Sequence, residues 1–241
     1  MDAIKTAGLT KKYKNCVAVD NLNLQIADGE LFTLLGINGA GKTTTIKLLS
    51  CLTQPTSGDA WVGGIEVTED PLAVKAIIGV SPQETAVAPN LTVKENLELL
   101  CGIHGFSKEK SREKLAALSA RFGLESILNK KAGILSGGWQ RRLSIAMALI
   151  SDPAVLFLDE PTLGLDVIAR SELWDIIRSL KGKVTIILTT HYMEEAQSLS
   201  DRIGIMKSGK LCFVGSAGEL MEKTGADTFE NAFISVAREE K

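Results

Sequence analysis

The sequence predicts an α/β protein in which a mostly parallel core sheet is flanked by helices. Two stretches, VLFLDEP at 155–161 and VTIILTTH at 184–191, have the apolar composition of buried strands, and a segment with helical spacing separates them. A third apolar strand at 31–35 leads through a glycine-rich turn into another helical segment. Strands that alternate with helices pair in parallel and are covered on both faces.

The N-terminal part predicts strands joined by turns. Leu22, Leu24 and Ile26 alternate with polar residues, and ADGE at 27–30 has turn composition. We therefore expect residues 18–35 to form a hairpin that leads into a buried strand. After a helix that follows Gly41, residues 57–67 predict a short strand pair with glycine turns.

Residues 84–150 have a different character, because helical spacing replaces the glycine turns. Thr92 and Glu95 form a T-x-x-E capping box, which predicts a helix that starts at Val93. The apolar face of the next helical stretch consists of Leu115, Leu118 and Phe122. We therefore expect a mainly helical insertion.

The alternation of strand and helix resumes after the insertion. A helix that begins near Val167 has its apolar side chains at Leu173, Ile176, Ile177 and Leu180. Residues 201–215 predict a hairpin that turns at KSGK, and residues 227–241 predict an amphipathic terminal helix.

Composition narrows the class of protein. The 241 residues are 45% hydrophobic and 23% charged, which is ordinary for one soluble domain. The formal net charge of −2 does not favour binding to nucleic acid. The four cysteines are far apart in sequence and predict neither a zinc site nor a disulfide framework. Because no apolar run approaches the ~20 residues of a membrane span, we expect any membrane role to depend on a partner.

A phosphate-binding loop is the most specific motif. GINGAGKT at 36–43 fits G-x-x-x-x-G-K-[ST], with a strand before it and a helix after it. Backbone N–H groups of such a loop wrap a phosphate chain, and the helix dipole adds partial positive charge. We expect Lys42 to reach the β- and γ-phosphates and the Thr43 hydroxyl to bind Mg²⁺.

A pair of carboxylates follows the strand at 155–158. Asp159 and Glu160 stand where open α/β sheets bind ligands. Asp159 can hold Mg²⁺ through water, and Glu160 can polarise the attacking water. Alone, such a pair is more often a helix cap or a solvated turn, but the phosphate loop upstream favours catalysis.

A second glycine turn, LSGGW at 135–139, directly precedes a helical stretch. Such a turn presents N–H groups to an anion, yet no lysine follows it.

Six motifs in this order resemble the ATP-binding subunit of ABC transporters over about residues 3–215. They are GINGAGKT, SPQE at 81–84, LSGGW, VLFLDEP, LGLD at 163–166 and TTHYMEEA at 189–196. The resemblance implies a P-loop NTPase fold of the ABC ATPase type, with an N-terminal antiparallel β subdomain and a helical subdomain. It divides the chain into a RecA-like core at about 1–83 and 151–215, a helical subdomain at about 84–150 and a tail at about 216–241.

The resemblance also implies roles for single residues. Tyr13 stacks on adenine, Gln83 contacts Mg²⁺ and the attacking water, and His191 binds the γ-phosphate and orients Glu160. Asp166 lines a dimer seam, although its position also suits a helix N-cap. The remaining residues implied to contact ATP are Asn38, Gly39, Ala40, Gly41, Thr44, Ser136, Gly137 and Gly138.

The same resemblance implies two chains in head-to-tail order, as a homodimer or with a related ATPase subunit. Each LSGG turn then closes the ATP that the other chain holds. Two positions depart from the family pattern, Trp139 where glutamine is usual and Leu163 where serine is common. Trp139 can pack inward or touch the opposite chain.

The implied partners are integral membrane permease subunits, and the implied place is the cytoplasmic face of the cell membrane. EPTLGLDVIAR and TTHYMEEAQSLSDRI resemble the bacterial branch that exports drugs, antibiotics, lipids or polysaccharides. One rival is a soluble ABC ATPase that acts on ribosomes or DNA, but the chain has a single cassette and no heptad run. A phosphate-loop kinase or GTPase is the other, but it would lack the Ser-Gly-Gly turn and the Asp-Glu pair.

Overall fold

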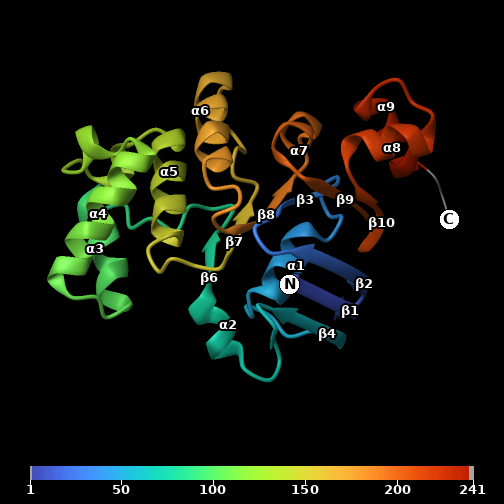
Figure 1. Cartoon of the computed structure of the whole chain (residues 1–241), viewed down its shortest axis with the longest axis horizontal. Helices are drawn as coiled ribbons and strands as arrows, with labels where there is room; N and C mark the ends of the chain where they lie inside the picture. Colours follow the sequence, from blue (N-terminus) through green and yellow to red (C-terminus); the bar gives the residue numbers. More distant parts are fainter. Residues whose placement is uncertain (1, 239–241) are drawn as a thin grey trace.

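The computed structural model describes residues 2–238, which form two sheets with helices between and around them (Figure 1). The strands are β1 (Asp2–Tyr13), β2 (Cys16–Ala27), β3 (Leu31–Leu35), β4 (Ser57–Val62), β5 (Ile65–Glu66), β6 (Ile78–Ser81), β7 (Val155–Asp159), β8 (Thr185–Thr190), β9 (Arg202–Lys207) and β10 (Lys210–Gly215). The helices are α1 (Lys42–Leu49), α2 (Pro71–Ile77), α3 (Val93–Ile103), α4 (Lys108–Phe122), α5 (Gly137–Ala148), α6 (Val167–Arg178), α7 (Met193–Leu199), α8 (Ala217–Thr224) and α9 (Phe229–Arg238). Two short 3₁₀ turns, η1 (Glu125–Ile127) and η2 (Ala132–Ile134), connect α4 to α5.

The larger sheet is mostly parallel, as predicted. Its order is β10-β9-β3-β8-β7-β6, and only the β9–β10 pair among these strands is antiparallel. Every residue of β3, β7 and β8 is buried, because helices or the second sheet cover both faces. The carboxyl ends of β3, β8 and β7 are therefore neighbours at one edge.

The smaller sheet is antiparallel and corrects one prediction. Its order is β2-β1-β4-β5, so β2 pairs with β1 and not with the strand that follows it. The predicted hairpin at 18–35 is wrong in this respect, because the turn after Ala27 carries the chain into the other sheet, where β3 lies between β8 and β9. A strand such as β3, in which every residue is buried and four of the five are apolar, requires cover on both faces, which the edge of a hairpin does not provide.

Helix α1 lies between the two sheets, and its apolar side chains join both. Ile46, Leu48 and Leu49 pack in one cluster with Ile4 and Leu22 of the small sheet and with Phe32 and Phe157 of the large sheet. The glycine loop before α1 is thus attached to a rigid support.

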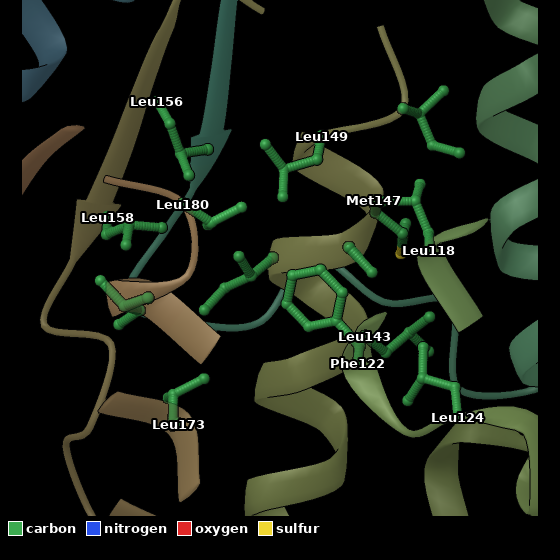
Figure 2. Packing of buried hydrophobic residues seen from close by; sticks show 14 of the residues in the cluster. Leu118, Phe122, Leu124, Leu143, Met147, Leu149, Leu156, Leu158, Leu173 and Leu180 are labelled. Carbon is green, nitrogen blue, oxygen red and sulfur yellow. The ribbon is translucent and has the colours of Figure 1, made fainter. Parts of the chain in front are cut away.

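A second core fills the other face of the large sheet. Alternation along β7 sends Leu156 and Leu158 to this side, where Figure 2 shows them converging with Leu143 and Met147 of α5 and Leu173 of α6. A third cluster packs α7, α8 and α9 against β9 and β10. The groups α3–α5 and α8–α9 lie at opposite ends of the view in Figure 1.

The helix start at Val93 is confirmed. The Thr92 hydroxyl accepts from the Glu95 backbone N–H at 3.1 Å, and the Glu95 carboxylate accepts from the Thr92 N–H at 2.7 Å. These bonds lower the pKa of Glu95. Helices α2 and α7 were not expected, since each is seven residues long and too short for a clear periodicity. Helix α8 lies within the tail at about 216–241 that the sequence predicted to be helical.

Among residues 2–238, no helix combines the length and apolarity needed to cross a bilayer. All four cysteines are free thiols.

Candidate functional site

A cavity of about 460 Å³ opens at the carboxyl ends of β3, β7 and β8. Its described lining consists of Tyr13, Cys16, Ala18, Asn38, Gly39, Ala40, Gly41, Lys42, Thr43, Thr44, Gln83, Glu160, Leu163 and His191. Residues from five of the six sequence motifs, all except LSGGW, therefore meet in one place.

The loop between β3 and α1 has a backbone shape that requires glycine. Gly39 and Gly41 have φ of +82° and +106°, and a Cβ at Gly41 would lie 2.3 Å from the backbone oxygen of Ala18. Gly41 is also the N-cap of α1 and provides no capping side chain. The first-turn N–H groups of α1 are therefore left for an anionic ligand.

Lys42 is held at the floor of the cavity by three oxygen atoms. Its Nζ donates to Gly36 O at 2.7 Å and to Ile37 O at 3.3 Å, and it lies 3.3 Å from Oε1 of Glu160. The side chain is only 6% exposed. A buried ammonium needs this compensation, and the arrangement fixes the Lys42 ammonium in the wall of the cavity beside the glycine loop.

Glu160 has an unusual backbone conformation directly after β7. Its φ is +48°, which costs a non-glycine residue about 1–2 kcal/mol. The N–H of Glu160 donates to Thr189 O and Oγ1, both at 3.1 Å, so β8 holds the strained turn in place. Oε2 lies 2.8 Å from Nδ1 of His191. Both carboxylate oxygens thus have a basic partner.

Asp159 lies one residue earlier and forms a separate oxygen cluster. Its Oδ1 accepts from the Thr43 hydroxyl at 3.1 Å and from the Thr189 hydroxyl at 2.5 Å. Asp159 is 4% exposed and reaches the cavity through Thr43. Hydroxyl and carboxylate oxygens are the ligand types that Mg²⁺ prefers.

The remaining lining residues surround the mouth of the cavity. Tyr13 at the end of β1 is 44% exposed, and Nζ of Lys11 lies 5.0 Å from its ring centroid. Gln83, which follows β6, is exposed. Sequence reasoning gave no site role to Cys16, Ala18 and Leu163. The strand pattern after Tyr13 could have indicated the first two.

The LSGG turn at 135–138, from here on the signature turn, is not part of this cavity. Ser136, Gly137 and Gly138 are absent from the described lining, although they begin α5 as predicted. Ser136 is the N-cap but its hydroxyl makes no capping bond, and Ser136 and Gly137 are exposed. The turn therefore presents unused donors to solvent.

Two further residues of the predicted seam have contacts within their own chain. Asp166 is the N-cap of α6 and accepts from the Ala169 N–H at 2.9 Å, and it does not line the described cavity. Trp139 is partly buried against the helical core, with the Arg142 guanidinium 4.7 Å from its ring centroid. Trp139 thus packs inward to a large extent.

A glycine loop between a strand and a helix, a buried lysine and an acidic pair at the neighbouring strand end together define a phosphate-loop nucleoside triphosphatase. A family model described as ABC transporter matches residues 19–163. The chain belongs to the ABC transporter family. A model described as an AAA domain matches the shorter segment 132–195.

Similarity to curated proteins is extensive. The chain is 42% identical to the daunorubicin/doxorubicin resistance ATP-binding protein DrrA of Streptomyces peucetius, over 93% of this chain and 68% of DrrA. It is 43% identical to the human phospholipid-transporting ATPase ABCA3 over 92% of this chain, but it spans only 13% of that protein.

Solved structures agree with the fold. One is described as the ATP-binding subunit of an ABC transporter. The alignment with it includes 98% of this chain and 100% of that chain, with a TM-score of 0.87 and 25% sequence identity. A dimeric ATP-binding cassette in a post-hydrolysis state, bound to ADP and Pi, covers 88% of this chain and is itself 98% covered, with a TM-score of 0.80 and 30% identity. The chain is therefore an ABC-type ATPase domain, which excludes a kinase or GTPase of another phosphate-loop family.

Proposed function

We propose that the cavity binds Mg²⁺ and ATP. We further propose that the hydrolysis of ATP powers transport through separate membrane permease subunits. The observation that carries this proposal is the Glu160 carboxylate, which is held between Lys42 at 3.3 Å and His191 at 2.8 Å. A carboxylate with both oxygens fixed beside a phosphate-loop lysine is suited to act on a water molecule that attacks the γ-phosphate.

In this reaction, the loop at 36–43 and Lys42 bind the phosphate chain. A water oxygen forms a bond to the γ-phosphorus while the bond to the ADP oxygen breaks, and Glu160 accepts the water proton. His191 orients Glu160 and donates to the γ-phosphate. Asn38, Gly39, Ala40, Gly41 and Thr44 contribute backbone or hydroxyl contacts to the phosphates, and Tyr13 stacks on the adenine.

The residues present fit a bound Mg²⁺. Thr43 and Asp159 bring two oxygen atoms within 3.1 Å of each other, and the exposed amide of Gln83 lies at the same cavity. Mg²⁺ binds through few protein oxygens and keeps phosphate and water ligands. Thr43 and Gln83 would hold the ion directly and Asp159 would hold it through water. An ion bound there would neutralise phosphate charge.

Ser136, Gly137, Gly138 and Asp166 act on the ATP of a second chain. The turn has free donors but lies outside its own chain's cavity, so a head-to-tail pair satisfies both halves of the site. The dimeric cassette to which this chain is similar supports such pairing. ATP then favours the closed dimer, because only that state makes contacts from both chains to it.

We infer that the helical insertion at about 84–150 and the segment after Gln83 contact the permease. The core comprises about 1–83 and 151–215, and about 216–241 form the tail, whose last three residues lie outside the described part. The human relative is named a phospholipid-transporting ATPase and the Streptomyces relative a drug-resistance ATP-binding protein, and these names support a transport role, which we propose to be export. A permease partner implies a place on the cytoplasmic face of the membrane. The two names favour transport over action on ribosomes or DNA, as does the net charge of −2.

The test uses Glu160→Gln, which keeps the shape of the side chain but removes the base. We expect ATP binding to persist, turnover to fall at least about 100-fold, and ATP to shift the variant from monomer to dimer. Released phosphate and light scattering after size exclusion report the two effects. Glu113→Gln, at an exposed position of α4, is the control. Hydrolysis by Glu160→Gln at the wild-type rate would exclude Glu160 as the base.

A further inference from the structure

A buried arginine connects α5, the helix that begins at the signature turn, to the wall of the cavity. Arg141 lies in α5, one turn after Gly137, and is 5% exposed. Its two terminal nitrogens donate to consecutive backbone oxygens, one to Pro82 O and the other to Gln83 O, each at 2.6 Å. Both carbonyls belong to the segment that leaves β6 toward the cavity.

The geometry is suited to holding a backbone segment rigidly. The guanidinium is planar and presents its donors in a fixed fork, so two bonds to adjacent carbonyls determine both the position and the orientation of the loop. Hydrogen bonds from a charged donor are stronger than those between neutral groups. A lysine or a glutamine at this position cannot reproduce the fork.

The Arg141 guanidinium is buried close to two carboxyl groups, Asp159 and Glu195. Burial lowers the pKa of Arg141, and the Asp159 and Glu195 carboxyl groups oppose that shift. Burying a guanidinium costs free energy unless it is paired. Here its hydrogen-bond partners are the carbonyls of the loop that carries Gln83.

We propose that Arg141 is a positioning residue that couples the Gln83 loop of a chain to the same chain's signature turn. Gln83 faces the ATP of its own chain, whereas Ser136, Gly137 and Gly138 at the start of α5 face the ATP of the partner. A shift of Gln83 on nucleotide binding moves the carbonyls that Arg141 holds, and α5 moves with them. The two ATP sites of the dimer are thereby linked. This inference rests on the proposed function.

The experiment compares Arg141→Gln and Arg141→Lys with the wild-type chain. Because Arg141 does not line the described cavity, we expect ATP affinity to stay within about twofold while kcat falls about tenfold in Arg141→Gln. Arg141→Lys keeps the charge and should recover part of kcat. Arg202→Gln is the control, since Arg202 also donates to a backbone oxygen, Gln25 O at 2.8 Å, and also lies outside the described cavity lining, but its other partner is the Glu30 carboxylate and not the Gln83 loop.

A double-mutant cycle with Gln83→Ala separates coupling from a merely structural role. If Arg141 acts through Gln83, Arg141→Gln should lower kcat by less than about twofold in the Gln83→Ala background. Circular dichroism and thermal unfolding confirm that the variants fold.

The possible outcomes are distinct. A wild-type kcat in Arg141→Gln would overturn the inference about Arg141, and so would a full additional loss of kcat when Arg141→Gln is added to Gln83→Ala. Neither result would affect the proposed function. An equal loss in Arg202→Gln would also overturn it, because the effect would then be general. A wild-type chain that neither binds nor hydrolyses ATP would refute the proposed function together with this inference.

Discussion

Nδ1 of His191 lies 2.8 Å from Oε2 of Glu160, while Oε1 of the same carboxylate lies 3.3 Å from Nζ of Lys42. The partners come from two different elements, the end of β8 and the start of α1. The Glu160 side chain is 7% exposed, so solvent does not compete strongly for either oxygen. Removing one partner therefore frees the carboxylate to rotate.

We expect His191→Ala to lower the ATPase rate about 100-fold with ATP affinity changed by less than about threefold. The imidazole orients the base but provides little of the phosphate binding. Steady-state phosphate release and equilibrium binding of a fluorescent ATP analogue measure the two quantities. His104→Ala is the control, because the ring of this second histidine stacks on the ring of Phe106, with the two centroids 5.8 Å apart. His104 is not among the described residues that line the cavity. Equal losses in both variants would contradict the assignment.

Gly137→Asp should spare ATP binding by the monomer but abolish ATP-driven dimer formation and turnover. A Cβ at Gly137 meets its nearest atom, Leu165 Cδ2, at 3.9 Å, so the fold accepts a side chain there. The added carboxylate would face the partner's phosphates. Gly218→Asp is closely matched, since Gly218 also follows a serine N-cap in a first helical turn and has its nearest contact at 3.9 Å. Light scattering in the presence of ATP should show a dimer for the Gly218→Asp variant but not for the Gly137→Asp variant.

Two glycines of the phosphate loop should differ in their contribution to stability. Both have positive φ, but a Cβ at Gly41 overlaps the Ala18 backbone oxygen, whereas one at Gly39 has no neighbour within 4 Å among the described atoms. We expect Gly39→Ala to cost about 1–2 kcal/mol from backbone strain and Gly41→Ala to cost more than about 3 kcal/mol from strain and overlap together. Urea unfolding measures both. Equal costs would mean that the overlap relaxes freely.

Glu195 predicts a pH dependence of stability. Burial raises its pKa above the ordinary value of 4.5, and the hydrogen bonds from Thr190 and Trp174 oppose the shift in part. The folded state then binds the proton more tightly than the unfolded chain does, so this residue destabilises the fold as pH rises above 4.5. The cost is complete above the folded pKa.

Glu195→Gln should therefore raise the Tm at pH 8, by about 2–4 °C per kcal/mol gained, with the gain shrinking as pH falls toward the ordinary pKa. Glutamine retains an oxygen to accept from the indole of Trp174, which donates to Glu195 at 3.0 Å. Glu194→Gln on the same helix is exposed and is the control. A gain that is constant from pH 4 to pH 8 would contradict the sign argued for Glu195.

Local signals in the sequence account for much of the fold. The capping box at Thr92 and Glu95, the apolar runs of β7 and β8 and the glycine loop at 36–43 each depend on residues within a few positions of one another. Such patterns follow from helical and strand periodicity and from turn chemistry. Their order along the chain also sufficed to identify the family resemblance and most of the residues that line the cavity, although not Cys16, Ala18 and Leu163.

Tertiary structure decided what the periodicity leaves open. The pairing of β2 with β1 and not β3 depends on which sheet can bury each strand, and the predicted hairpin at 18–35 was wrong for that reason.

The sequence alone was enough to predict which residues carry the phosphate chemistry, because the loop at 36–43 and the pair Asp159 and Glu160 are recognisable from neighbours in the chain. Only the tertiary structure decided that Lys42 and His191 occupy opposite oxygens of Glu160 and that Arg141 holds the carbonyls of Pro82 and Gln83. These contacts join residues 31 or more positions apart. Their geometry follows from the order of strands in the sheet, which no local pattern contains.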